Sequence, residues 1–159
     1  MPIRIAAFML FVGLLAFQIP QEIRAQDFAI EEMSDEETIA VKPFSISRVL
    51  PFNGGLRVFI TTDNPDAVAA LLTSGALQAQ LSDHNSESEA IVSLSLGKAV
   101  QCSDTVDPVY MVYGDPLPSC DGNPPAHIEY FFEVAAALGP GRDLAIGQDP
   151  EFLWLIEER

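Results

Sequence analysis

The stretch "PFNGGLRVFITTDNPDAVAALLTSG" (residues 51–75) decides the fold class, because it passes from a turn to a strand and then to a helix. The dipeptide Asn53–Gly54 can adopt the positive φ angles that a tight turn between antiparallel strands needs. The apolar residues after it alternate with polar ones, which is the period of a half-buried strand. We therefore expect a β-hairpin with strands at 38–50 and 55–62.

A short helix is predicted directly after this hairpin. Asn64 can cap its first turn, Pro65 suits the first helical position, and Asp66 is favourable at the positive end of the helix dipole. Gly75 is placed to end the helix in a left-handed conformation. A helix of about ten residues is marginal on its own, so we expect it to pack against a sheet.

The remaining periodic segments favour strands. Residues 89–96 alternate apolar residues with serine, as a half-exposed strand does, and residues 76–82 fit a strand or a continuation of the helix. Residues 127–138 and 150–158 also fit either structure; aromatic and β-branched residues favour a strand in 127–138. The predicted fold class is α+β, a mainly antiparallel sheet or sandwich with one or two short helices and one disulfide.

The N-terminus has the order of a secretory signal peptide. Arg4 precedes an apolar run from Ile5 to about Phe17, and a polar stretch leads to Ala25. A run of about 13 residues is shorter than the roughly 20 that span a bilayer, although an uncleaved anchor stays open. We expect a signal peptide at 1–25, a flexible acidic linker at 26–37, and a single globular domain at 38–159 in the periplasm or outside the cell.

The charge excludes several partners. The chain has a formal net charge of −15, and the part after residue 25 keeps six of eight basic and 22 of 23 acidic residues. Such a protein repels phosphate backbones and anionic lipid headgroups. We expect no nucleic-acid partner and no membrane insertion after signal cleavage; a protein partner or a neutral or cationic ligand is compatible with the charge.

Both cysteines lie at the ends of "CSDTVDPVYMVYGDPLPSC". In an oxidising compartment an even cysteine count predicts a Cys102–Cys120 disulfide, whereas a redox pair needs closer spacing and a zinc site needs more ligands. Tyr110, Met111 and Tyr113 inside this loop are candidate partner-binding residues. The segment is either a core strand or a displayed patch, and burial is the favoured interpretation.

The sequence contains no set of residues that indicates catalysis or a cofactor. His84 and His127 read as solvated or boundary residues, serines lack a nucleophile elbow, and the glycines lack phosphate-loop spacing. We expect no cofactor. The polar tip offers oxygen donors for calcium at Asp83, Asn85, Glu87 and Glu89, although it lacks EF-hand spacing, and a solvated loop is the favoured interpretation.

Residues 39–72 resemble the start of the periplasmic domain of flagellar basal-body FliL proteins. The resemblance rests on a "PF" strand, a second long strand and an acid-capped helix. It implies a subunit of an envelope assembly. The disulfide loop and the short apolar N-terminus depart from that pattern, so no residue role is carried over.

These observations favour a small exported acidic protein that acts by binding, as a non-catalytic accessory protein. A hydrolase that uses scattered carboxylates, or a structural subunit of an envelope assembly, is the alternative. The sequence names neither the partner nor the oligomeric state.

Overall fold

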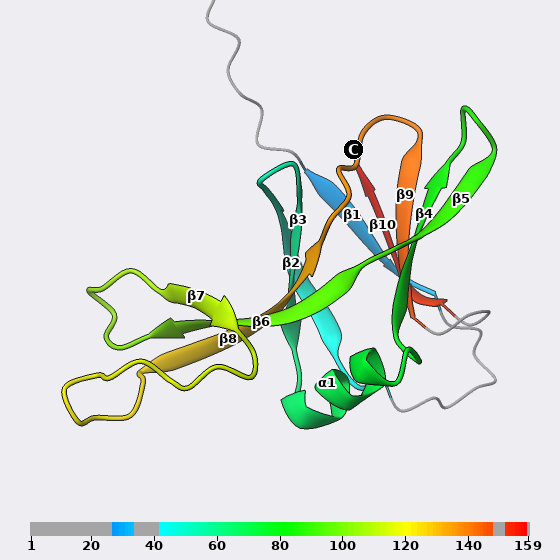
Figure 1. Ribbon diagram of the computed structural model, residues 1–159. Helices are drawn as coiled ribbons and strands as arrows, with labels where there is room; N and C mark the ends of the chain where they lie inside the picture. Colours follow the sequence, from blue (N-terminus) through cyan, green and yellow to red (C-terminus); the bar gives the residue numbers. More distant parts are fainter. Residues whose placement is uncertain (1–26, 34–41, 148–151, 159) are drawn as a thin grey trace, which may run out of the picture.

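The computed structural model describes residues 27–33, 42–147 and 152–158, which form ten strands and one helix (Figure 1). The strands make two five-stranded sheets in which every neighbouring pair is antiparallel. The first sheet has the order β1 (Phe28–Glu32), β10 (Phe152–Glu158), β9 (Arg142–Gly147), β4 (Gln78–Asp83), β5 (Ser88–Val92). The second has the order β2 (Ser45–Phe52), β3 (Gly55–Thr61), β8 (His127–Val134), β6 (Leu94–Gln101), β7 (Val109–Val112). The mainly antiparallel fold predicted from the sequence is confirmed.

The hairpin and the helix that follows it are both present. β2 and β3 are joined through Asn53 and Gly54, whose φ angles are 47° and 74°. Helix α1 (Pro65–Thr73) begins after Asn64, whose side chain accepts a hydrogen bond from the Ala67 backbone N–H at 3.1 Å. Gly75, at φ 74°, follows the helix in the left-handed conformation. Local sequence therefore determines these boundaries, as capping rules predict.

The main core lies between the two sheets. Apolar side chains on the facing sides of both sheets, and Val68 from α1, form one buried cluster. Phe44 packs edge-on against Phe132 of the second sheet, at 5.1 Å between ring centroids, and stacks on Trp154 of the first sheet. The helix lies at one end of the sandwich (Figure 1). It closes the space between the sheets, which explains how so short a helix is stable.

The segments that sequence leaves ambiguous are strands. Residues 127–134 form β8, which pairs with β3 on one side and β6 on the other. Its residues Tyr130, Phe132 and Val134 face the core. Residues 78–83 and 152–158 are strands as well. The strand favoured for residues 127–138 is confirmed over 127–134, and the choice left open for the other two segments falls to strand, because each has one face in the core.

One strand lies inside the predicted linker at 26–37. Residues 28–32 form β1, and Phe28 and Ile30 pack against the core on one face. This part of the linker prediction is wrong. The apolar residues of "FAI" contact the core and form a strand in spite of the acidic residues that follow. The predicted signal peptide at 1–25 and the remaining linker residues 34–37 lie outside the described residues. Within the described ranges, no helix is long and apolar enough to cross a membrane.

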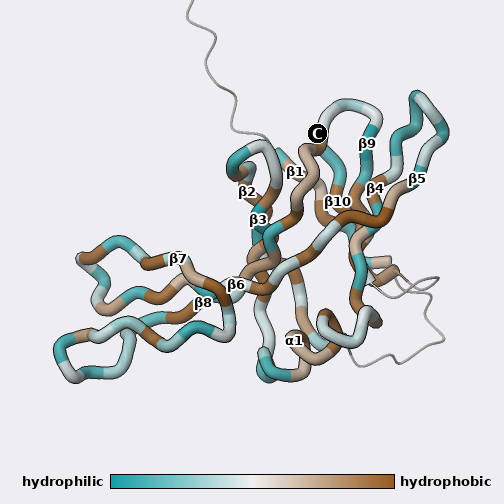
Figure 2. The backbone as a smooth tube through the Cα atoms, viewed as in Figure 1, coloured by the Kyte–Doolittle hydropathy of each residue, from teal (hydrophilic) through white to brown (hydrophobic). Residues whose placement is uncertain are grey.

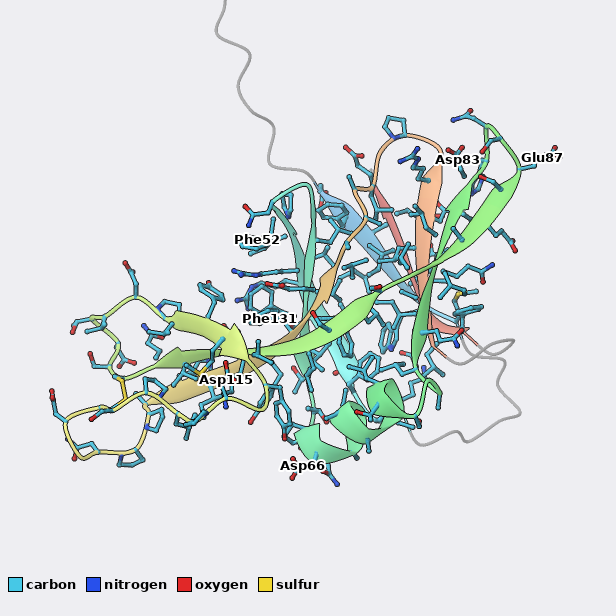
Figure 3. All side chains as sticks on the ribbon, viewed as in Figure 1. Phe52, Asp66, Asp83, Glu87, Asp115 and Phe131 are labelled. Atoms are coloured by element: carbon cyan, nitrogen blue, oxygen red, sulfur yellow. A yellow bond between two sulfur atoms is a disulfide. The ribbon has the colours of Figure 1, made fainter. Side chains whose placement is uncertain are left out.

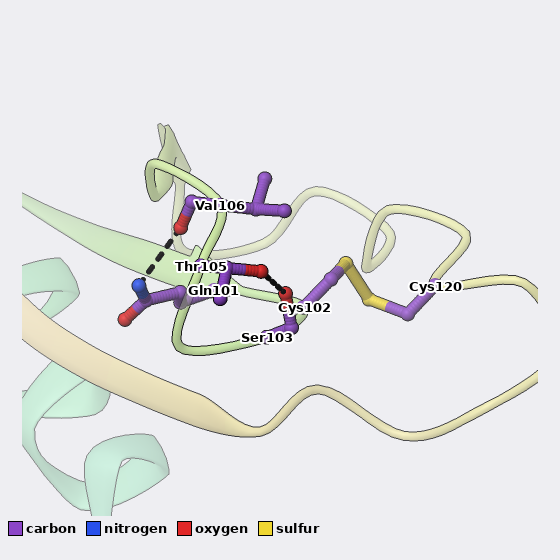
Figure 4. Close-up of a disulfide and its surroundings, with 6 residues drawn as sticks. All are labelled: Gln101, Cys102, Ser103, Thr105, Val106 and Cys120. Carbon is purple, nitrogen blue, oxygen red and sulfur yellow. Dashed lines mark hydrogen bonds between the residues drawn. A yellow bond between two sulfur atoms is a disulfide. The ribbon is translucent and has the colours of Figure 1, made fainter.

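The ends of β6 and β8 extend from the sandwich and carry β7. We call residues 99–128 the arm; it projects to one side of the molecule (Figure 1). The disulfide between Cys102 and Cys120, predicted from the sequence, joins the two loops of the arm, with 5.3 Å between the Cα atoms (Figure 4). Beside it, Gln101 donates from its side chain to the Val106 carbonyl at 2.8 Å. The disulfide and this bond brace the loop that leads into β7.

Candidate binding surface

The outer face of the second sheet, which points away from the first sheet, carries a second apolar cluster. Phe59, Ala99 and Phe131 are between 1% and 2% exposed there, although only one sheet layer supports them. The ring centroids of Phe59 and Phe131 lie 5.5 Å apart, and Tyr110 packs edge-on against Phe131 at 5.9 Å. A buried cluster on the outside of a sandwich requires other side chains to cover it.

Large apolar side chains surround this cluster and remain accessible. Leu50 and Phe52 on β2 are 46% and 37% exposed, and Tyr110 and Val112 on β7 are 45% and 64% exposed. Their strand register places all four on the outer face. Figure 3 shows Phe52 and Phe131 on this side of the second sheet. Contiguous apolar exposure of this kind marks an interaction surface more often than scattered single residues do.

Arg57 on β3 links the two ends of this face. Its guanidinium carbon lies 3.4 Å from the centroid of the Phe52 ring, 4.2 Å from that of Tyr110 and 4.9 Å from that of Phe131. Nε and Nη2 both donate to one oxygen of Glu133, at 3.2 and 3.0 Å. Stacking on partly desolvated aromatic rings contributes about 1–2 kcal/mol. The guanidinium therefore acts as a rigid part of the surface.

A second arginine–glutamate pair lies on the same face. Arg48 makes two hydrogen bonds to the carboxylate of Glu129, at 2.6 and 2.9 Å, and lies over the Phe59 ring at 3.7 Å. The bonds from Arg48 hold the pKa of Glu129 below its usual value, and the same bonds raise the pKa of Arg48. Each arginine is thus matched by one carboxylate, and the face is locally close to neutral on a strongly acidic chain.

Two shallow grooves cross this face. One, of about 400 Å³, is lined by Phe52, the β2–β3 turn and the last residues of β8. The other, of about 200 Å³, is lined by Arg57, Tyr110, Val112 and Phe131 among others. Both grooves include Ser95 and Glu133, so they adjoin. They offer concave space beside exposed aromatic side chains, which suits side chains of a partner.

The three predicted partner-binding residues do not share a face. Tyr110 belongs to the outer face, whereas Met111 pairs with Lys98 in the register of the opposite face. The hydroxyl of Tyr113 donates to Asp66 at the start of α1, and its ring packs against Tyr130 at 5.9 Å. The preference for burial of this segment is wrong. β7 lies at a sheet edge in the arm, so no second layer covers it.

Sequence reasoning did not single out Phe52, Arg57, Phe131 or Glu133. A signal was present in β8, where Phe131 stands between two glutamates on the face that should be polar. A large aromatic residue at a polar-face position indicates a second apolar contact. Only the fold shows that β3, β7 and β8 combine their outer residues.

The outer face of the first sheet mixes acidic and apolar side chains. A groove of about 460 Å³ there includes Asp83, His84, Glu89 and Asp143 together with the apolar residues Met33, Phe152 and Leu155, and the side chain of His84 bonds to Asp143. Figure 2 shows hydrophilic residues at the tip of the β4–β5 hairpin. We call this side the acidic face, for the carboxylates of the β4–β5 hairpin and Asp143, although Ile91 on β5 is 60% exposed there. The outer face of the second sheet differs in its aromatic rings and its paired arginines.

The four calcium candidates lie at this tip without forming a ligand cage. Asp83 accepts the backbone N–H groups of Asn85 and Ser86, at 2.9 and 3.4 Å, and the bond from Asn85 is the main cause of its lowered pKa. Glu89 accepts the side-chain amide of Gln80 at 2.7 Å. Within the described ranges, no three His, Cys, Asp or Glu side chains gather as a metal site would require. The tip is a hydrogen-bonded turn.

Comparison with protein-family models, curated proteins and solved structures finds no match to this chain. What the outer face of the second sheet can do is defined by its chemistry. It offers fixed aromatic rings, neutralised arginines and adjoining grooves, which are features of recognition by contact.

Proposed function

We propose that this protein is an exported, non-catalytic binding protein of the periplasm or extracellular space, which contacts a partner protein through the outer face of the second sheet. The observation that carries the proposal is the exposure of Leu50, Phe52, Tyr110 and Val112 around the Arg57–Glu133 pair. Aromatic residues and arginine are the types that dominate binding energy at protein interfaces.

The charge distribution supports this choice of face. Contact with a partner removes charged groups from water, and the cost is lowest where charges are already paired. Arg48 and Arg57 are each bonded to a glutamate on this face. The acidic face of the first sheet stays solvated and keeps the protein soluble while the second sheet is covered.

A hydrolase is the alternative, and the polar groove is the place to consider it. Acid–base hydrolysis needs one carboxyl group that holds its proton near neutral pH. Asp83 has the opposite tendency, because turn N–H groups and Arg142 stabilise its anion. The side chain of His84 is 62% exposed, so its bond to Asp143 lies at the surface. This arrangement favours binding over hydrolysis.

Site-specific photocrosslinking in the exporting cell tests the proposal. A photoreactive residue at position 112 on the aromatic face is compared with one at position 89 on the acidic face. Both positions are exposed edge-strand sites. We expect a discrete crosslinked protein from position 112 alone. Equal crosslinking from both positions, or none from position 112, contradicts the proposal.

A further inference from the structure

Three of the four sheet edges in the described part of the chain are protected against pairing with another strand. Unpaired backbone groups at an edge can accept a foreign strand, and proteins block this with charge, proline or a bulge. β1 carries Glu31 and Glu32, and β5 carries Glu89. β2 carries Arg48, a register shift before it, and Pro51.

The fourth edge, β7, has none of these devices. Its sequence is Val-Tyr-Met-Val, without charge or proline, and its pairing with β6 is regular. Val109, Tyr110 and Val112 are 47%, 45% and 64% exposed. These residue types have the highest strand propensity. The strand has only four residues, so a partner segment can pair with it over a few residues, and this segment must be short and extended.

The ladder geometry shows which backbone groups are free for pairing. Tyr113 donates its N–H to the Leu96 carbonyl at 3.1 Å, so it is bonded to β6. Bonding directions alternate along an antiparallel strand. Val109 and Met111 therefore also bond to β6, while Tyr110 and Val112 direct their N–H groups to the open side. The carbonyl of Val112 accepts the Asp115 N–H in the following turn.

The exposed charges in the loops that flank this edge are all negative, whereas the nearby Arg57 is already bonded to Glu133 and Lys98 to the carbonyls of Tyr113 and Asp115. Asp104, Asp107, Asp115 and Asp121 are exposed in the loops that flank β7. Between residues 99 and 126 there is no lysine or arginine. A second copy of the chain would bring these like charges together, whereas an extended segment with basic flanks would be attracted by them. The groove of about 200 Å³ beside Tyr110 and Val112 can accept one of its apolar side chains.

We propose that the free edge of β7 binds an extended segment of a partner protein as an added strand, and that this segment has an apolar β-forming centre flanked by lysine or arginine. This inference rests on the proposed binding function and names its partner class. The backbone N–H groups of Tyr110 and Val112 hold the strand, and the flanking aspartates select its charge.

Nine-residue synthetic peptides provide the test. Five central positions vary among Val, Ile, Thr, Tyr and Phe, and two lysines flank each side; a matched set has glutamates instead. The protein variants are Val112→Pro, which removes one free N–H without breaking the β6 ladder, and Val112→Ala, which removes only side-chain contacts. Circular dichroism checks that both variants fold. N-methylation of a bound peptide gives the same test on the unaltered protein.

We expect lysine-flanked peptides to bind at least tenfold more tightly than their glutamate counterparts. Val112→Pro should weaken binding at least tenfold, and at least threefold more than Val112→Ala, whose loss reports the side-chain contacts of Val112 alone. Exchange of the Tyr110 and Val112 amide protons should slow at least tenfold in the complex. Strand addition is overturned if no lysine-flanked peptide binds, if neither proline nor N-methylation matters, or if these amides are already protected in the free protein. If crosslinking from position 112 persists in those cases, the proposed function stands and only strand addition fails.

Discussion

Arg57 on β3 and Tyr110 on β7 meet across the two strands that lie between them in one sheet, with the guanidinium carbon 4.2 Å from the Tyr110 ring centroid. Neighbouring strands lie about 4.8 Å apart, so these side chains must reach toward each other over β8 and β6. Phe131 lies beneath the contact, 4.9 Å from the same guanidinium carbon. The contact joins the edge strand to the interior of the sheet and gives the binding surface a defined shape.

Replacing Arg57 with lysine should lower the free energy of unfolding by about 1–2 kcal/mol, because an ammonium group cannot stack on the rings as guanidinium does. The matched control is Arg48→Lys, whose side chain is 43% exposed, against 12% for Arg57. That change should cost about 0.5 kcal/mol. Urea denaturation measures both values. Because Arg48 lies over one ring and Arg57 lies near three, equal losses would show that the additional ring contacts of Arg57 add no stability.

The hairpin and the helix are predictable because their signals are local. Asn53, Asn64, Pro65 and Gly75 each require or favour one backbone conformation, and the structure has those conformations. Strand β9 was not predicted from the sequence, because its segment "RDLAIG" is short and follows a turn rich in glycine and proline. Its burial depends on β4 and β10, which are distant along the chain. Local pattern cannot give this information.

The binding surface was predictable only in part. Tyr110 was predicted together with Met111 and Tyr113, because tyrosine and methionine are favoured at contact surfaces. Phe52 read as a turn residue and Arg57 as the polar face of a strand, and both interpretations are locally correct. Phe52 and Arg57 form one surface with Tyr110 only because the strand order puts β2, β3 and β7 in the same sheet. Strand order is a non-local property.

Gly97 should not tolerate alanine. A Cβ at this position would lie 2.4 Å from Cζ of Phe131 and 3.1 Å from the Met111 carbonyl oxygen. Phe131 is only 2% exposed and has little room to move, so Gly97→Ala should destabilise by about 1–3 kcal/mol. Gly114→Ala, with no atom within 4 Å of the added Cβ, should change stability by at most about 0.5 kcal/mol. Thermal unfolding compares the two; a neutral Gly97→Ala contradicts the packing described.

Replacement of both Cys102 and Cys120 with serine should lower the free energy of unfolding by about 3 kcal/mol, since the bridge closes a loop with a sequence separation of 18. Hydrogen exchange should increase most in β7, which lies within that loop. If exchange rises equally in β9, in the body of the sandwich, the disulfide does not act locally on the arm.

The bond between Tyr113 and Asp66 predicts a dependence on alkaline pH. The hydrogen bond to the Asp66 carboxylate is the main cause that raises the pKa of Tyr113 from 10.0 to about 12. In the native state Tyr113 therefore keeps its phenolic proton at pH values at which the unfolded chain has lost it. This contribution is complete below pH 10 and disappears as the pH rises through about 12.

Absorbance of tyrosinate checks this expectation, with Tyr113→Phe identifying the signal among three tyrosines. Asp66→Ala should return the pKa of Tyr113 toward 10, and Asp66→Asn, which keeps an acceptor without the charge, should give a smaller decrease. The stability lost between pH 10 and 12 should be less in Tyr113→Phe than in the unaltered protein. An unchanged titration in Asp66→Ala excludes the bond as its cause.

The central claim is that the aromatic face of the second sheet binds the partner, and the dissociation constant of the partner crosslinked from position 112 tests it most directly. Calorimetric titration compares Tyr110→Ala and Tyr110→Phe on the aromatic face with Glu89→Ala on the acidic face. Loss of an interface anchor costs 2 kcal/mol or more, which is about 30-fold in affinity. We predict that Tyr110→Ala weakens binding about 30-fold, while Tyr110→Phe and Glu89→Ala stay within threefold. Equal effects of Tyr110→Ala and Glu89→Ala, or no effect of Tyr110→Ala, would contradict the assignment of the binding surface.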